Sequence, residues 1–544
     1  MSSVSRRRFL QLSSTAVSLS LLGACAPAAP AQPTPAKPAA QVPAVPVLPT
    51  PVATQVPAAA TKPAGPKRGG TFTLAKTGAQ LDFNPLRLMP AHHAFTRALF
   101  NTLTRYGAQL KPQPELAESW NVSPDGSTIT LKLRQGVKFH SGREFTADDV
   151  KFSLQFGQTN EDVTMRPSFR AIKQLETPDK YTVVFGFGVA YPAMFDVLDT
   201  LYIVDKETFE DRAKTAIGTG PFKLDKYIPN DRLELSAFKD YWDKGKPYVD
   251  KYVVRDIPDV TALAVNLETG AVDCVWQINY RDLVRLSESG GKFATDNGAK
   301  GADMFDFAIN TKAEPLTNKK VRQAIAWSID RERFAKAILV GLAQPTCLLW
   351  PRHSWAYFPD LEGKIGYDLD KAKALLKEAG LEKGFDTEIQ TSSKNFGFLE
   401  IAQIVQADLK KVGVNAKVVD LEQAQFQTRL QNKQIVMSIH SYGRTGRDPG
   451  STMTGAKAWY NDAEGSWTRF ESQEWDKLRQ ELNATVDLEK RKVTARKLQE
   501  MALDECFTLP MAPNQRAWAF GSYVKGFDYN LDYAPFVDGV WLDK

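Results

Sequence analysis

The pattern that most constrains the fold is a strand, a helix and a second strand in close succession between residues 387 and 421. The stretch "TEIQT" at 387–391 is strand-like, and residues 416–421 are again strand-like. Between them, residues 398–413 predict a helix that ends at a glycine and carries on one face Ile401, Val405, Leu409 and Val412. This βαβ order predicts a parallel sheet covered by helices, and therefore an α/β fold.

Other segments support a mixed α/β chain. Further helices are expected at 367–380 and, as a pair, within 470–505. A buried strand is expected at 71–75, and Pro124-Asp125-Gly126 has the residue types of a turn before a strand in which every second residue is apolar: Ile129, Leu131 and Leu133. Thr146 to Asp149 resembles a helix cap.

The N-terminus has the pattern of an export signal rather than of a domain. Basic residues precede a short apolar run at 12–22, which is too short to span a membrane. The segment "SRRRFL" at 5–10 resembles the twin-arginine export motif. Leu22-Gly23-Ala24-Cys25 resembles a bacterial lipobox, which predicts a signal peptide at 1–24 and lipidation of Cys25. The alternative is a generic secretory signal in which Cys25 is incidental.

Residues 25–66 are rich in proline and alanine and predict an extended tether. At about 3.1 Å per residue, such a segment reaches on the order of 100 Å. The remainder, about 480 residues, is long enough for two or three domains. The sequence therefore predicts an exported, lipid-anchored protein on the outer side of the cytoplasmic membrane or in the periplasm.

The composition bounds the chemistry of the remaining chain. The net charge of +6 falls to +3 without Arg6, Arg7 and Arg8, and no basic stripe is interleaved with aromatics, so a nucleic-acid partner is not expected. Three cysteines follow the tether without metal-site spacing, which leaves either one disulfide or buried free thiols: Cys274, Cys347 and Cys506. No catalytic or metal motif is present, so we expect no enzyme, no cofactor and no metal.

Several blocks together resemble the peptide/nickel-type extracellular solute-binding proteins, the receptor subunits of ABC importers. They include "LTRYGAQLKPQPELAESWNVSPDGSTITLKLRQGVKFHSGREFTADDVKFSL" at 103–154, and they occur in the family's order at 103–154, 217–273, 307–334 and 367–380. The resemblance spans almost everything from Gly69 to the C-terminus.

The resemblance implies a bilobal periplasmic-binding-protein fold of the large, three-subdomain variety, which closes on a ligand. Two crossings near 305–311 and 509–515 would form the hinge. The implied parts are lobe I at 67–100 with 215–305 and 512–544, an accessory subdomain at 101–214, and lobe II at 306–511.

The resemblance also implies where the ligand lies. In peptide-binding relatives, an aspartate before an acidic-Pro pair holds the peptide amine. Here that position falls at Thr445, between Arg444 and Arg447, three residues before Asp448-Pro449. A free amine would meet two like charges there, so we expect a ligand with an anionic end. The other implied ligand-binding residues are Trp276, Gln277, Gln423, His440 and Tyr442.

Trp276 and Tyr442 would offer faces for an apolar or aromatic body. An acidic peptide in reverse orientation, a stacked sugar and, through His440, a metal chelate remain alternatives.

The predicted function is a monomeric receptor that delivers a small solute or peptide to the permease and ATPase of an ABC importer. The alternatives are a periplasmic chaperone or ligand sensor with the same fold and, third, a hydrolase.

Overall fold

The computed structural model describes residues 65–78, 82–88, 90–107, 111–300, 303–395, 397–443, 446–460 and 465–544. Gly65–Lys544 forms one compact unit. The predicted signal, Cys25 and most of the tether lie outside the described residues. Three sheets organise the described chain, and we name its parts after them: lobe I, the accessory subdomain and lobe II. The residue bounds predicted for these parts stay predictions.

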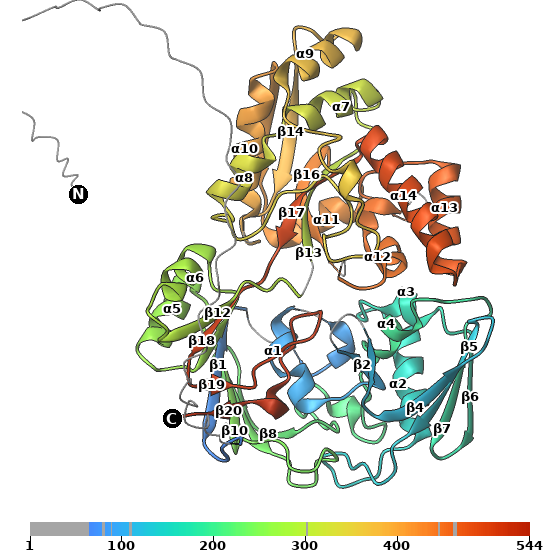
Figure 1. Cartoon of the computed structure of the whole chain (residues 1–544), viewed down its shortest axis with the longest axis vertical. Helices are drawn as coiled ribbons and strands as arrows, with labels where there is room; N and C mark the ends of the chain where they lie inside the picture. Colours follow the sequence, from blue (N-terminus) through green and yellow to red (C-terminus); the bar gives the residue numbers. More distant parts are fainter. Residues whose placement is uncertain are drawn as a thin grey trace, which may run out of the picture. The chain divides into compact units, whose positions relative to one another are not determined.

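Lobe I is built on a seven-stranded sheet of the described chain, in the order β12-β18-β11-β1-β10-β9-β8 (Figure 1). The central strand β1 runs parallel to β10 and β11, and the remaining pairs are antiparallel. Its strands are β1 (Thr71–Lys76), β8 (Phe222–Ile228), β9 (Arg232–Ala237), β10 (Lys251–Asp256), β11 (Cys274–Trp276), β12 (Phe293–Asp296) and β18 (Trp518–Gly521). The other elements are α1 (Pro90–Leu99), α5 (Val260–Glu268), α6 (Tyr280–Ser287), β19 (Val524–Lys525) and β20 (Trp541–Leu542).

The accessory subdomain holds a four-stranded antiparallel sheet in the order β4-β5-β7-β6. The predicted turn joins β4 to β5, the alternating residues of β5 are buried, and Thr146 and Asp149 form a capping box at the start of α2. These local predictions are confirmed. The elements are β2 (Thr104–Tyr106), β3 (Pro112–Pro114), β4 (Ala117–Val122), β5 (Thr128–Leu133), β6 (Gln174–Asp179), β7 (Thr182–Gly186), α2 (Ala147–Thr159), α3 (Arg166–Phe169) and α4 (Met194–Leu198).

Lobe II is built on a five-stranded sheet in the order β15-β14-β16-β13-β17. Its strands are β13 (Asp303–Ile309), β14 (Phe385–Thr391), β15 (Val414–Asp420), β16 (Met437–Tyr442) and β17 (Thr508–Asn514). Its helices are α7 (Lys319–Ser328), α8 (Arg331–Ala337), α9 (Leu369–Glu378), α10 (Phe398–Lys410), α11 (Gln423–Gln431), α12 (Pro449–Gly455), α13 (Gln473–Ala484) and α14 (Leu488–Glu505).

Short 3₁₀ turns complete the described chain at Pro85–Arg87, Phe209–Asp211, Pro359–Leu361, Lys457–Trp459 and Val537–Gly539.

The predicted βαβ unit is confirmed: β14, α10 and β15 follow one another, and β14 pairs with β15 in parallel. The expectation of a parallel sheet holds only in part, because β13 pairs antiparallel with both β16 and β17. The physical reason is that β13, by which the chain enters lobe II, runs opposite to the other strands of the sheet, including β17, by which the chain leaves. The fold is therefore α/β with a mixed sheet in lobe II.

Two chain crossings join lobe I to lobe II, as a two-crossing hinge requires. The first runs from β12 to β13 and the second from β17 to β18. The segments predicted as hinge at 305–311 and 509–515 largely form β13 and β17, so the crossings lie just outside them. Arg516 Nη2 in the second crossing donates to Asp303 Oδ2 at the end of the first, at 2.8 Å. The two crossings are therefore braced against each other.

The cysteines of the described chain are free and buried. Burial raises the pKa of the Cys274 thiol well above its usual value. The alternative of a disulfide is thus excluded for Cys274, Cys347 and Cys506. Among the described residues, none of the helices has the length and apolar character that a membrane crossing needs.

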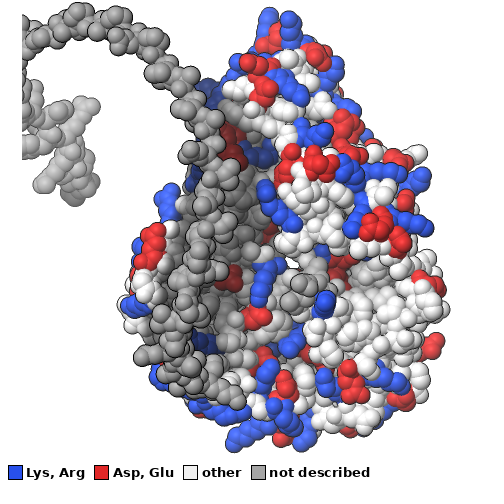
Figure 2. All heavy atoms as spheres, in the orientation of Figure 1, with Lys and Arg blue, Asp and Glu red and all other residues white. Residues whose placement is uncertain are grey.

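Charge is unevenly distributed over the surface. On the face shown in Figure 2, basic and acidic side chains are intermingled over lobe II, whereas a broad uncharged area covers part of the accessory subdomain. On this face, the described part of lobe II therefore shows no large field of one sign.

Candidate ligand-binding site

Trp276 lies at the end of β11 and is paired in register with Trp518 at the start of β18. Their rings stack with centroids 5.4 Å apart, and Tyr533 and His93 flank Trp276 at 6.4 and 5.8 Å. Both tryptophans are fully buried. Because β18 begins directly after the second crossing and its first residue is paired with Trp276, these rings form an aromatic wall of lobe I beside the hinge.

The aromatic wall carries polar atoms without partners in the described chain. Trp276 Nε1, Trp518 Nε1 and Asn530 Nδ2 are buried N–H donors that make no hydrogen bond there. Burial lowers the pKa of His93 to about 3, so the ring is neutral. An unpaired buried donor costs about 1–3 kcal/mol. The wall is therefore suited to a group rich in hydrogen-bond acceptors.

Gln277 follows Trp276 and has a left-handed backbone, with φ of 62°. Its backbone N–H donates to Ala517 O at 2.9 Å, and its side-chain Oε1 accepts from the Thr77 hydroxyl at 3.0 Å. Gln277 thus links β11 to the second crossing. Its predicted contact with a ligand stays a prediction.

Tyr442 ends β16 in lobe II and is almost fully buried, with 4% of its surface exposed. Its hydroxyl donates to Leu349 O at 3.0 Å, and its ring meets Trp459 edge to face at a centroid distance of 4.5 Å. These contacts fix the orientation of the Tyr442 ring within lobe II.

Arg447 was expected to offer a free charge to the ligand. Of the predicted site residues, it is the one whose surroundings differ most from the expectation. It is 1% exposed, and its Nη2 donates to Asp199 Oδ2 at 2.7 Å and to Asp532 Oδ2 at 2.5 Å. Asp196 Oδ1 lies 3.9 Å from Nη1, and the guanidinium lies 5.8 Å from the centre of the Tyr106 ring. The positive charge of Arg447 is therefore already matched by carboxylates.

These carboxylates come from the other side of the cleft. Asp196 and Asp199 belong to α4 and its C-terminal end, and Asp532 belongs to the C-terminal tail of lobe I. Asp448 N–H adds a second link, donating to Asp196 Oδ2 at 3.2 Å. Burial alone would lower the pKa of Arg447, but Asp532, Asp199 and Asp196 raise it well above its usual value. Burial raises the pKa of Asp196 to about 6, which Arg447 opposes.

The other predicted residues lie deeper or outside. Gln423 begins α11, and its Oε1 accepts from Asn395 Nδ2 at 2.8 Å. His440 lies two residues before Tyr442 on β16 and is 3% exposed. Arg444 and Thr445 lie outside the described residues. In the described chain, three or more His, Cys, Asp or Glu side chains do not gather as a metal site would require.

The structure thus brings Trp276, Gln277, Tyr442 and Arg447 to the borders of the two lobes. Sequence reasoning missed Trp518, Asp196, Asp199 and Asp532. Asp199 and Arg447 are separated by 248 residues, so no local pattern marks them as partners. The pairing of Trp518 with Trp276 likewise depends on the tertiary fold. In the sequence, the only signal for Trp518 was the tryptophan itself, in "RAWAFGS".

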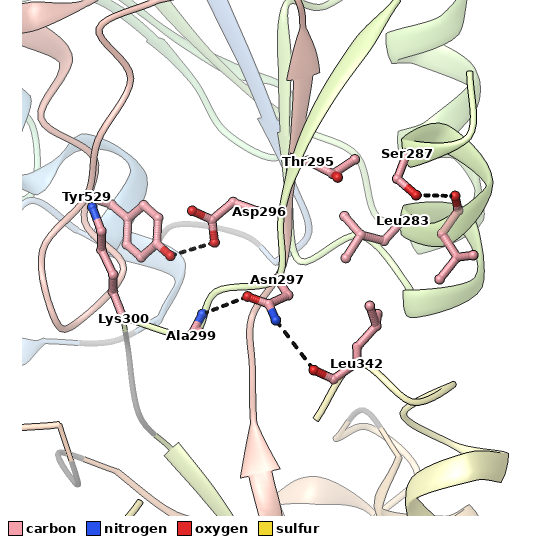
Figure 3. A pocket seen from close by; sticks show the side chains of 10 residues that line it. Leu283, Ser287, Thr295, Asp296, Asn297, Ala299, Lys300, Leu342 and Tyr529 are labelled. Carbon is pink, nitrogen blue, oxygen red and sulfur yellow. Dashed lines mark hydrogen bonds between the residues drawn. The ribbon is translucent and has the colours of Figure 1, made fainter. Parts of the chain in front are cut away.

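Two cavities adjoin lobe II. One, of about 410 Å³, lies beside the first crossing and is lined from lobe I by α6, β12 and Tyr529 and from lobe II by Leu342 (Figure 3). Asn297 Nδ2 donates to Leu342 O at 3.4 Å across it, and the Tyr529 hydroxyl donates to Asp296 at 2.8 Å. The other, of about 420 Å³, lies between the accessory subdomain and α13 and includes Tyr191 and Arg479. Neither lining includes Trp276, Tyr442 or Arg447.

Comparison with known proteins defines the class. The family model described as "Bacterial extracellular solute-binding proteins, family 5 Middle" matches residues 111–464, which is more than half of the chain. The chain belongs to this family of extracellular solute-binding proteins.

Curated relatives and a solved structure agree with this family. Heme-binding protein A of Haemophilus influenzae is 27% identical over 515 residues, covering 86% of this chain and 92% of that protein. The dipeptide-binding protein of Escherichia coli is 28% identical over 494 residues, covering 84% and 92%. The ABC transporter-associated periplasmic binding protein DppA from Helicobacter pylori, solved in complex with peptide STSA, superposes with a TM-score of 0.75 at 26% identity and covers 88% of this chain and 99% of that one. These relatives are named as binding proteins.

Proposed function

We propose that this chain is a lipid-anchored receptor that captures a small solute between its two lobes and delivers it to an ABC importer. The observation that carries the proposal is the buried contact between the lobes at Arg447, Asp199 and Asp532. Polar groups from both lobes converge there beside the aromatic wall. In a hinged protein, a ligand that contacts both lobes selects the closed arrangement.

The proposed ligand has an anionic end and an apolar or aromatic body. Three N–H donors of the aromatic wall support the anionic end, because a carboxylate accepts several hydrogen bonds: Trp276 Nε1, Trp518 Nε1 and Asn530 Nδ2. The stacked rings of Trp276 and Trp518 support the body. Arg447 would join only if the ligand displaced Asp532 from it, so in this proposal the wall donors and Arg444 carry the larger part.

A pair of matched compounds tests the charge of the ligand. The full chain, stripped of bound compounds by unfolding and refolding, is titrated with 3-phenylpropionate and with 3-phenylpropylamine in a calorimeter. The proposal predicts that the carboxylate binds at least tenfold more tightly than the amine, because the wall supplies donors. Tighter binding of the amine would contradict the anionic ligand. It would favour a peptide with a free amine, in line with the relatives that are named for peptide binding.

Delivery to an importer needs a test in cells. Deletion of the gene should abolish uptake of the labelled compound that co-purifies with the protein, and a plasmid copy should restore it. Unchanged uptake combined with a lost transcriptional response would instead favour a ligand sensor that uses the same fold. Neither result depends on knowing the ligand's charge.

A further inference from the structure

One face of the lobe II sheet carries a buried polar cluster, which we define as Asp306, Gln390, Ser438, His440 and Thr508. Asp306 on β13 is paired in register with His440 on β16, and Ser438 is paired with Gln390 on β14. Directly paired residues point to the same face of a sheet, as do residues two apart on one strand. Asp306, Ser438, His440 and Gln390 therefore share one face across three strands.

The opposite face of the same strands is largely apolar. Phe305, Phe307 and Ile309 of β13, together with Met437 and Ile439 of β16, lie in the hydrophobic core against the helices of lobe II. Both faces are buried, since Asp306 and Ser438 are 0% exposed. A face that only packed against helices would be served by apolar residues, so an aspartate, a histidine and a serine there call for another explanation.

Ser438 Oγ has no hydrogen-bond partner in the described chain. Asp306 Oδ1 and both ring nitrogens of His440 also lack a well-aligned hydrogen bond, although the N–H groups of Leu509 and Phe307 act on Asp306 and the Ser438 carbonyl acts on His440. Asp306 Oδ2 accepts from Thr508 Oγ1 at 2.7 Å, and His440 Nε2 lies 3.3 Å from the same oxygen without bonding to it. Buried polar atoms in folded proteins are almost always paired, and exceptions are costly. These atoms therefore point to a group that the protein binds.

The polar cluster shares one face of β16 with Tyr442. Tyr442, His440 and Ser438 alternate along one face of β16, and Tyr442 is paired with Met304, two residues before Asp306. At about 3.4 Å per residue, His440 lies roughly 7 Å behind Tyr442. The Trp467 ring meets His440 edge to face at 5.1 Å. Polar side chains thus follow one face of β16 from Tyr442 into lobe II.

The chemistry of the polar cluster favours an uncharged polar group. Burial lowers the pKa of His440 to about 3, so the imidazole is neutral and offers one donor and one acceptor. The Ser438 hydroxyl also donates and accepts. An anion placed among such groups would lack a counter-charge and would face Asp306, whereas a hydroxyl or a primary amide would find both partners that it needs.

We propose that Asp306, Ser438 and His440 form a polar subsite of lobe II that binds a hydroxyl or amide group at the far end of the ligand. The proposal rests on the proposed function, because it assumes a ligand whose other end lies at the aromatic wall. It adds that the ligand is polar at both ends.

The test compares 3-(4-hydroxyphenyl)propionate with 3-phenylpropionate, which differ only in a hydroxyl at the end away from the carboxylate. The full chain is titrated with each compound, as wild type, Ser438→Ala and His440→Phe. Ser328→Ala serves as the control, because Ser328 is a buried serine of α7 whose hydroxyl is paired with Ile325 O. The subsite predicts that the hydroxyl tightens binding at least tenfold in wild type and in Ser328→Ala, and less than threefold in the other two variants.

Melting temperatures separate binding from structure. Because the Ser438 hydroxyl is unpaired, Ser438→Ala should melt at the wild-type temperature or above it, while Ser328→Ala loses a hydrogen bond and should melt lower. A clear drop in melting temperature for Ser438→Ala would show that its hydroxyl is a structural group, and would overturn the subsite.

The remaining outcomes distinguish the two proposals. If both compounds bind equally well, the anionic ligand stands and the subsite is wrong. If neither binds, the anionic ligand is wrong, and the compound that co-purifies with the protein is titrated into stripped wild type and Ser438→Ala instead. At least fivefold weaker binding to the variant would support the subsite, and unchanged binding would overturn it.

Discussion

Arg447 Nη2 of lobe II donates to Asp199 Oδ2 of the accessory subdomain at 2.7 Å, with both side chains buried. Arg97 holds the other carboxylate oxygen, Asp199 Oδ1, at 2.8 Å. One aspartate is therefore shared by an arginine of its own lobe and an arginine of the opposite lobe. The contact between the lobes is an extension of an ion-pair network that lobe I already contains.

Removing Arg447 should be costly because it leaves the buried Asp199 and the partly buried Asp532 with less positive charge. Breaking a buried pair in this way typically costs about 3–5 kcal/mol. We expect Arg447→Ala to lower the free energy of unfolding by that order in urea titrations. Arg496→Ala is the control, since Arg496 pairs with Asp360 on the surface, where such pairs contribute about 0–1 kcal/mol. Equal effects of the two substitutions would contradict a buried interlobe pair.

The hinge predicts a second, steric effect at Gly298 in the first crossing. Its φ is 79°, and a Cβ added there would lie 2.4 Å from Arg516 O in the second crossing. Gly298→Ala should therefore destabilise the chain beyond the backbone strain alone, which is about 1–3 kcal/mol. Gly291→Ala isolates that strain, because Gly291 has a φ of 87° and open space around it. Melting temperatures that fall equally in both variants would argue against tight packing of the crossings.

Asp306 predicts a pH dependence of stability. Burial raises its pKa to about 7, opposed by Thr508, Arg331 and the N–H groups of Leu509 and Phe307. Because the folded pKa lies above the unfolded value of about 3.9, the stabilising contribution is fully present below pH 4 and is lost as the pH rises to 7. One pKa unit corresponds to about 1.4 kcal/mol, so the loss is at most about 4 kcal/mol.

Asp306→Asn cannot ionise and should remove this loss. The melting temperature of the variant relative to that of wild type should therefore rise between pH 5 and pH 8. His440 also faces Asp306, and its titration affects the stability only below pH 6.5. Because the variant and wild type both contain His440, this effect is common to the two proteins. A difference that stays constant over this range would mean that Asp306 is ionised throughout.

Lipid anchoring is tested at Cys25. Cys25→Ala should release the protein from the membrane fraction, because the modified cysteine would be its only anchor in this account. Ser18→Ala, in the same apolar run, should keep the protein at the membrane. Membrane retention of Cys25→Ala would reject the lipobox interpretation and leave a generic secretory signal.

The elements that could be predicted from the sequence are those with strong local patterns. The strand, helix and strand from β14 to β15 follow from apolar periodicity, and the cap of α2 follows from Thr146 and Asp149. The antiparallel course of β13 and β17 could not be predicted in this way, because it depends on the chain entering and leaving lobe II.

The site was harder to predict for a related reason. Trp276 and Tyr442 were proposed from a family resemblance, and the structure places them at the borders of the lobes. That Arg447 is already paired depends on Asp199 and Asp532, which only the tertiary fold brings to it. A sequence pattern can indicate that an arginine lies at the cleft. Whether its charge is free to bind a ligand depends on partners that are far away in the sequence.

Small-angle X-ray scattering tests most directly the central claim that the two lobes capture a solute between them. The full chain is stripped of bound compounds, and scattering is recorded before and after adding back the co-purified compound at a concentration that calorimetry shows to be saturating. The account predicts a smaller radius of gyration in the bound state, because the ligand's contacts with both lobes select the closed arrangement. An unchanged radius of gyration at saturation would contradict it.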